Sequence, residues 1–136
     1  GIDIVEKALP RFPNDPKILN WYGYILVTYT DRLQEAEDHL LRALELSPES
    51  QYIQDSVAWL YFKLGDYEKA MRYLKIMIEV EVKDTTIAYH AGMIYYKMGE
   101  IESALEYFSL AVNLNTDDSD VIAAQRMIDE LEDYYE

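Results

Sequence analysis

The residues of this chain that could do chemistry are two histidines, several pairs of acids and one stretch that occurs twice. His39 and His90 lie 51 positions apart, and neither has a second histidine or a cysteine at the spacing of metal ligands. Acid pairs such as Glu35 with Asp38 are better explained as one solvated helix face than as a general acid and base. No nucleophile elbow or phosphate-binding loop occurs. We therefore expect no enzyme, no catalytic residue, no metal and no cofactor.

The stretch that occurs twice reads YFKLGDYEKA at residues 61–70 and YYKMGEIESA at residues 95–104. Its two glycines, Gly65 and Gly99, are 34 residues apart, and the same interval links Ala36, Ala70 and Ala104. A fixed period of this length indicates a repeat architecture. Apolar residues spaced three and four apart predict amphipathic helices within each unit. Each unit is therefore expected to be two helices joined by a tight turn.

Small residues and glycines have clear roles in such a hairpin. Gly65 and Gly99 can adopt a positive φ and end the first helix of their units. Pro16 and Pro48 are expected just inside helix starts, where the missing N–H costs nothing. Small residues at matched positions let the two helix axes approach closely; they are Gly23, Ala58 and Gly92 on first helices, and Ala36, Ala70 and Ala104 on second helices.

Taken together, the 34-residue period, the small residue at the eighth position, the aromatic at the eleventh, the glycine at the fifteenth and the alanine at the twentieth resemble tetratricopeptide repeats. The resemblance implies an all-α, right-handed superhelical solenoid of helical hairpins with about eight helices. The expected organisation is a single array: 1–13 as the second helix of a preceding partial repeat, 14–48, 49–82 and 83–116 as three repeats, and 117–136 as a capping helix. The first repeat has one additional residue, so a wider turn is expected there.

Composition excludes several function classes. The chain has 136 residues, a formal net charge of −14 and no cysteine. Such an acidic chain has no basic surface to displace counterions from nucleic acid. No apolar run reaches the roughly 18–20 residues that cross a bilayer. Eight acids and one base lie in the last 20 residues; this acidity is interpreted first as a solubilising cap and second as an attraction for a basic partner.

The resemblance also implies where a partner would bind, because first helices line the concave surface of such solenoids. Aromatic rings there offer large contact area at low entropy cost. The predicted partner-binding residues are Asn20, Tyr24, Tyr52, Asp55, Trp59, Lys63, Tyr89, His90, Met93 and Lys97. Tyr24, Trp59, Tyr89 and Met93 are expected to be exposed in this groove, whereas Phe62 and Tyr96 are expected to serve packing.

One specialised function of the family is disfavoured. The Lys, Asn and Arg residues that clamp the carboxylate tails of chaperones are replaced at most of the corresponding positions, which hold Asn20 and Tyr24, Ser56 and Trp59, and Thr86 and His90. The function implied is a non-catalytic protein-protein interaction scaffold that binds a peptide or partner protein. Two alternatives stay open: a regulatory or substrate-presenting arm of a larger enzyme or envelope assembly, and a self-associating homo-oligomer that uses exposed Ile2, Val5 and Leu9. The wording resembles bacterial tetratricopeptide proteins, some of them attached to the cell envelope. We expect a soluble segment and leave its compartment, cytoplasmic or periplasmic, open.

Overall fold

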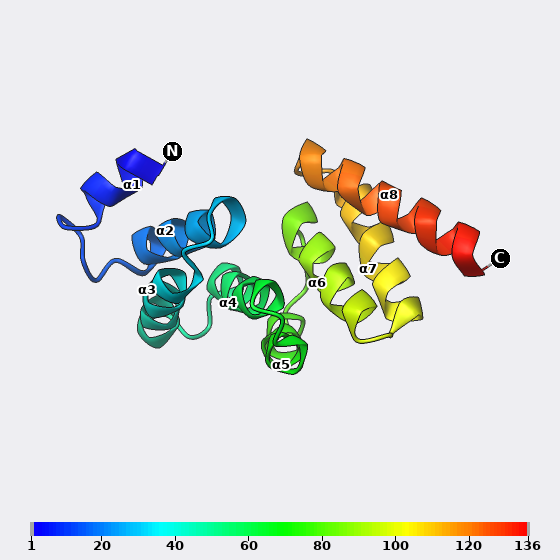
Figure 1. Ribbon diagram of the computed structural model, residues 1–136, viewed down its shortest axis with the longest axis horizontal. Helices are drawn as coiled ribbons and strands as arrows, with labels where there is room; N and C mark the ends of the chain where they lie inside the picture. Colours follow the sequence, from blue (N-terminus) through cyan, green and yellow to red (C-terminus); the bar gives the residue numbers. More distant parts are fainter. Residues whose placement is uncertain (1, 136) are drawn as a thin grey trace. The chain divides into compact units, whose positions relative to one another are not determined.

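The computed structural model describes residues 2–135, and every regular element in that part of the chain is an α-helix (Figure 1). The eight helices are α1 (Ile2–Ala8), α2 (Pro16–Tyr29), α3 (Leu33–Leu46), α4 (Gln51–Lys63), α5 (Tyr67–Met77), α6 (Thr85–Lys97), α7 (Ile101–Leu114) and α8 (Asp118–Tyr135). The prediction of an all-α fold built from helical hairpins is confirmed. Gly1 and Glu136, the outermost positions of the predicted segments 1–13 and 117–136, lie outside the described residues.

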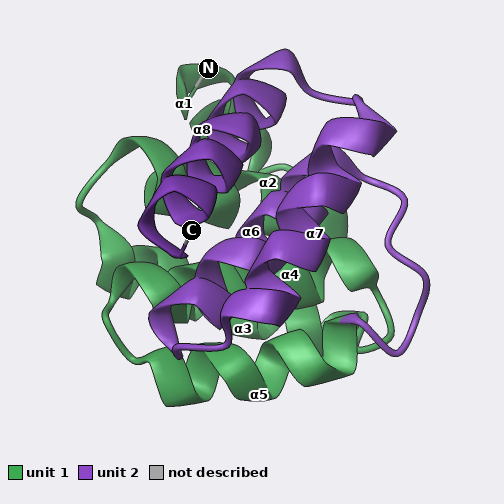
Figure 2. Ribbon diagram, turned by 90° about the vertical axis from the view of Figure 1, so that its right-hand side faces the viewer, with its two compact units in different colours: residues 1–77 green, residues 78–136 purple. Residues whose placement is uncertain are grey.

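The chain divides into two compact units, coloured separately in Figure 2. Unit 1 spans Gly1–Met77 and holds α1 to α5, whereas unit 2 spans Ile78–Glu136 and holds α6 to α8. In unit 1, α2 packs on α3 and α4 packs on α5; in unit 2, α6 packs on α7. The predicted repeat boundaries at 48, 82 and 116 stay a prediction.

Close approach of paired helices depends on the predicted small residues. Gly23 in α2 lies against Leu40 in α3, and a Cβ at position 23 would overlap the leucine side chain. Gly92 in α6 faces Phe108 in α7 in the same way, with the ring carbons 2.5 Å from where a Cβ would be. Leu40 and Phe108 are fully buried, so these contacts form the centre of each hairpin.

Turns in two hairpins follow the predicted glycine rule. Gly65 has a φ of 81° and Gly99 a φ of 78°. After α4, the amide of Asp66 donates to the Tyr61 carbonyl at 2.9 Å, and the Gly65 amide donates to Phe62 at 3.0 Å. This pair of bonds is the Schellman arrangement, which satisfies carbonyls that the helix end leaves open.

The turn of the first hairpin has no glycine and uses a threonine instead. Thr30 Oγ1 donates to the Leu26 carbonyl at 2.6 Å and accepts from the Arg32 amide at 3.0 Å. The expected wider turn is wrong, because residues 30–32 connect the helices as briefly as residues 64–66 do. The additional residue lengthens α2, which has 14 residues where α4 has 13.

Helix starts confirm one proline prediction and correct the other. Asp15 caps α2 through its carboxylate, which accepts from the Lys17 amide at 2.9 Å, and Pro16 stands at the first helical position. Pro48 instead belongs to the turn before α4. That helix begins at Gln51, because Ser50 Oγ accepts from the Ile53 amide at 3.3 Å.

Tyrosine rings fill the next layer of two hairpins at matching positions. Tyr61 of α4 stacks on Tyr73 of α5 at 5.6 Å between ring centroids, and Tyr95 of α6 stacks on Tyr107 of α7 at the same distance. Tyr61 is 4% exposed. Tyr61 and Tyr95 therefore serve packing between the two helices of their hairpins.

The first and last helices pack within their own units. Val5 of α1 is fully buried, and α1 contacts α2, so the expected exposure of Val5 for self-association is wrong. Ile2 and Leu9 are half-buried. At the other end, α8 contacts α7 and α6 just as α4 contacts α3 and α2. It therefore packs on the α6–α7 hairpin in the place that a further first helix would take, and its role as a cap stays a prediction.

Candidate partner-binding surfaces

Unit 1 brings four of its predicted binding residues to accessible positions along α2 and α4. Tyr52 is 62% exposed and Lys63 is exposed, while Asn20 and Tyr24 are half-buried. A cavity of about 300 Å³ has Asn20 and Tyr52 in its wall, and a shallower depression of about 650 Å³ has Thr28 and Lys63. We call this surface, Asn20, Tyr24, Thr28, Tyr52 and Lys63, the α2–α4 face.

Two other predicted residues of unit 1 are not accessible. Trp59 is only 6% exposed and Asp55 only 4%. The indole stacks on Phe62 at 4.6 Å between centroids with the rings nearly parallel, and Lys63 Nζ lies 5.3 Å from its centroid. The expected groove exposure of Trp59 is therefore wrong, because its own helix covers the ring with residues three and four positions later. Phe62 serves packing as expected.

Unpartnered polar atoms distinguish the α2–α4 face. Asn20 Oδ1 and Thr28 Oγ1 are both inaccessible to water and have no hydrogen-bond partner among the described residues. Buried polar atoms normally have partners, since leaving one without costs about 1–3 kcal/mol. Asn20, Tyr24 and Thr28 follow one another at four-residue intervals, so they share one side of α2. Asn20 is one of the predicted partner-binding residues, whereas Thr28, on the same side of α2, is not among them.

In unit 2, as in unit 1, some of the predicted binding residues are accessible to solvent and others are buried. His90 is 2% exposed and therefore interior, with its ring 6.0 Å from that of Tyr89. Tyr89 and Met93 are half-buried, and Lys97 is exposed. Burial raises the pKa of Tyr89, and the nearby Asp120 carboxylate adds to the shift. His90 is thus wrong as an accessible contact, because it lies on the packed side of α6.

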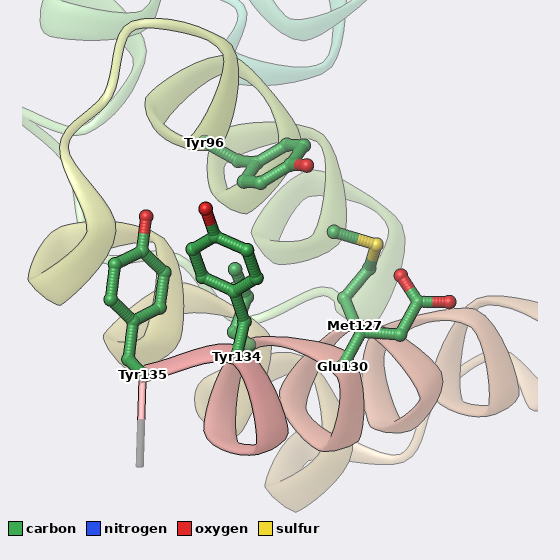
Figure 3. A pocket seen from close by; sticks show the side chains of 6 residues that line it. Tyr96, Met127, Glu130, Tyr134 and Tyr135 are labelled. Carbon is green, nitrogen blue, oxygen red and sulfur yellow. The ribbon is translucent and has the colours of Figure 1, made fainter.

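The last helix covers part of α6 with specific bonds. Thr86 Oγ1 donates to Asp120 Oδ2 at 2.6 Å, so the start of α8 is joined to the start of α6. Near the other end of α8, Tyr96 and five residues of α8 surround an open cleft (Figure 3). Tyr96 was expected to serve packing, yet its ring is half-buried and lines this cleft.

A polar cluster joins the first three helices of unit 1. Tyr22 Oη lies 3.1 Å from both Glu6 Oε1 and Glu35 Oε1, and Arg32 Nη2 donates to it at 3.0 Å. Burial and the bonds to the two carboxylates raise the pKa of Tyr22 to about 12. The hydrogen bond from Arg32 holds the pKa of Glu35 below its usual value. His39 is half-buried, with its ring 4.9 Å from that of Tyr22.

Among residues 2–135, no three His, Cys, Asp or Glu side chains come together in a way that could hold a metal ion. Within that part of the chain, no helix combines the length and the apolar character that crossing a bilayer requires.

Comparison with known proteins identifies the repeated hairpins. The family model described as tetratricopeptide repeat matches residues 55–76 and 85–118, which include α6 and α7 whole and most of α4 and α5. These two stretches are similar to tetratricopeptide repeats. A curated relative, the TPR repeat-containing protein PA4667 of Pseudomonas aeruginosa, is 33% identical over 85 residues. The match covers 62% of this chain and only 14% of the length of that relative.

Solved structures share the fold of this chain. A crystal structure of MamA superposes with a TM-score of 0.66 at 19% identity, covering 98% of this chain and 82% of the MamA chain. The MamA MSR-1 C2 structure gives a TM-score of 0.60 at 20% identity, over 84% of this chain and 65% of that one. At these identities the likeness shows the α-solenoid fold alone.

Proposed function

We propose that this chain, with its tetratricopeptide-like repeats, is a non-catalytic interaction scaffold whose first unit binds an extended peptide on the α2–α4 face. Repeats of this kind support a general role in protein interaction. The observation that carries the finer proposal is the pair of unpartnered oxygens, Asn20 Oδ1 and Thr28 Oγ1. Once these two half-buried side chains turn toward solvent, backbone N–H groups of a bound peptide are the donors that would satisfy both oxygens.

Spacing of the two oxygens suits a short extended segment. They are eight positions apart on α2, which corresponds to about 12 Å along a helix axis. An extended strand rises about 3.3 Å per residue, so about four peptide residues would cover the distance. Tyr24 lies between the two on α2, and Tyr52 and Lys63 border the two ends from α4. A peptide lying along this path would meet the rings of Tyr52 and Tyr24, and then the Lys63 ammonium group at the end near Thr28.

Lys63 adds a preference for peptide charge. Its ammonium group is exposed and makes no ion pair among the described residues. A peptide with an acidic residue at the end near Thr28 would gain an exposed charge pair, worth up to about 1 kcal/mol. The proposal therefore favours extended peptides with one acid near one end.

The test is selection of linear peptides from a displayed library against the whole chain. Enriched peptides are then measured by calorimetry against Asn20→Ala and Thr28→Val, with Asn113→Ala, an exposed residue of α7, as the matched control. Each removed oxygen should weaken binding roughly five- to tenfold, since one hydrogen bond contributes about 1 kcal/mol or somewhat more. Equal binding by all four proteins, or no enrichment, would reject the α2–α4 face as the site.

A second candidate function is a repeat arm within a larger protein. The observation that favours it is the relative from Pseudomonas aeruginosa, in which the matched region is 14% of the whole length. In such a protein the α2–α4 face would bind another part of the same polypeptide or present a substrate to it. Sequencing the gene on both sides of this segment decides the question, because a catalytic domain there would be plain.

A further inference from the structure

The cleft at the end of unit 2 has a composition unlike that of the α2–α4 face. It lies between α6 and the second half of α8, has a volume of about 400 Å³, and opens to solvent (Figure 3). Its walls are Tyr96, Met127, Glu130, Leu131, Tyr134 and Tyr135. Three phenol rings and one carboxylate therefore surround a space large enough for a long side chain.

Helical spacing explains why α8 contributes five of these residues. Met127, Glu130, Leu131 and Tyr134 fall at intervals of three and four, so they share one side of α8. Leu131 is 5% exposed and anchors that side to the hairpin. Figure 3 shows Tyr134 and Tyr135 projecting from the end of the helix toward the side on which Tyr96 lies.

The rings of Tyr134 and Tyr135 at the rim of the cleft are exposed to solvent, so they do not serve to pack the interior of the protein. Tyr134 is 79% exposed and Tyr135 is 61% exposed. Their ring centroids are 4.8 Å apart with the planes at 68°, an edge-to-face pair that leaves ring faces open to a ligand. Neighbouring exposed rings beside a cleft are typical of an interaction site.

Charge at the cleft indicates the kind of group that would cover the rings. Glu130 makes no ion pair or hydrogen bond with any described residue. A protein cation already lies near one of the rings, since Lys97 Nζ is 5.8 Å from the Tyr96 centroid. Tyrosine faces attract cations electrostatically, and a carboxylate beside them adds a hydrogen-bonding anion. An apolar ligand would satisfy neither the carboxylate nor the hydroxyl groups.

We propose that this cleft, which we call the Tyr96–Tyr134 cleft, binds an arginine side chain of a partner protein. Arginine combines a flat cation that stacks on aromatic rings with a fork of donors that fits one carboxylate, whereas lysine offers only a point charge. The acids that α8 carries, Asp118, Asp120, Asp129, Glu130, Glu132 and Asp133, draw basic partners toward this end of the chain. The site uses residues other than those of the α2–α4 face and does not depend on peptide binding there.

The experiment is a titration of the whole ¹⁵N-labelled chain, followed by nuclear magnetic resonance at low salt. The probe is the peptide acetyl-Gly-Arg-Gly-amide, and the matched probe replaces arginine by citrulline, which has the same shape without the charge. Saturable shifts should concentrate on the amides of residues 127–135 and Tyr96 with the arginine peptide, and should be weaker with a lysine peptide. Equal shifts with citrulline, or shifts spread evenly over the acidic surface, would overturn the proposal.

Variants separate the cleft from general attraction to an acidic helix. Tyr134→Ala and Glu130→Gln should each lower the affinity for the arginine peptide roughly two- to fivefold. This is the loss expected for one exposed cation–π contact or one exposed charge pair. Glu132→Gln removes the same charge from α8 outside the cleft, and Tyr29→Ala removes a ring of similar exposure, 77%, from unit 1. Neither control should change the affinity. If Glu132→Gln weakens binding as much as Glu130→Gln does, the attraction is diffuse and the cleft is not the site.

Discussion

Gly92 in α6 and Phe108 in α7 are in such close contact that a Cβ at position 92 would lie 2.5 Å from the phenyl ring. Phe108 has no exposed surface, so the ring has no free space into which it could move. In the α4–α5 hairpin of unit 1, the corresponding positions hold a larger first-helix residue and a smaller second-helix residue, Ala58 and Leu74. Phe108 therefore leaves room only for a glycine at position 92.

Replacing Gly92 by alanine should destabilise the protein by about 1–2 kcal/mol. Alanine favours a helix over glycine by about 1 kcal/mol, but overpacking a full core costs about 1–3 kcal/mol. Urea unfolding followed by circular dichroism measures the net effect. In a Phe108→Leu background, the same substitution should cost less, because unit 1 holds alanine and leucine at the corresponding positions 58 and 74. A cost that is unchanged by Phe108→Leu would show that the ring contact does not set the size at position 92.

Replacing Gly99 tests the backbone alone. Its φ is 78°, and a Cβ there would meet no atom within 4 Å. Gly99→Ala should therefore cost about 1–2 kcal/mol, all of it from left-handed backbone strain, whereas Gly99→Asn should cost less because asparagine tolerates this region better. Thermal melting of both variants beside the wild type gives the comparison. Equal melting temperatures for alanine and asparagine would contradict strain as the cause.

The two threonines at the end of α2 should respond in opposite directions to valine. Thr28 Oγ1 has no described partner, so Thr28→Val should raise the free energy of unfolding by about 1 kcal/mol. Thr30 Oγ1 bonds to the Leu26 carbonyl and the Arg32 amide, so Thr30→Val should lower it by about 1 kcal/mol. Urea titration of both variants measures the difference. A stabilising Thr28→Val that also loses peptide affinity is the signature of a residue kept for binding.

Alkaline pH should weaken unit 1 through Tyr22. Its pKa is raised to about 12, so the fold favours the neutral phenol. A raised pKa gives stability that is complete below the ordinary tyrosine value of about 10 and is lost as the pH rises toward 12. Tyr22→Phe should cost about 1 kcal/mol at neutral pH through the lost hydrogen bonds.

The same variant should also lose less stability than the wild type does between pH 10 and 12. Tyr29→Phe, at an exposed residue with no described bond from its hydroxyl, is the matched control. Urea unfolding midpoints, measured at neutral pH and between pH 10 and 12, report both the cost of Tyr22→Phe and its smaller loss of stability at alkaline pH. Parallel wild-type and Tyr22→Phe curves would rule out Tyr22 as the group that titrates.

Helix positions and turn chemistry could be read from the sequence because they depend on nearby residues. Four residues illustrate this: the glycines that end α4 and α6, and the aspartate and proline that start α2, each act on backbone only a few residues away. The 34-residue period is likewise visible as a regular recurrence of residue types along the chain. Pro48 was misplaced because a proline fits both a turn and a helix start, and Ser50, which competes for the cap, was overlooked. The additional residue of the first repeat was visible, but its place in α2 depended on the threonine bonds of residue 30.

The accessible surface, by contrast, was decided by the tertiary structure. Sequence alone assigned Trp59, Asp55 and His90 to an inward side of their helices, but whether that side meets solvent or packed atoms depends on contacts with residues elsewhere in the fold. The cleft beside Tyr96 requires α8 to lie along α6, a pairing of segments about 30 residues apart that no local pattern specifies. Local periodicity therefore determined the repeat and its hairpins, whereas packing between helices determined which side chains remain free to meet a partner.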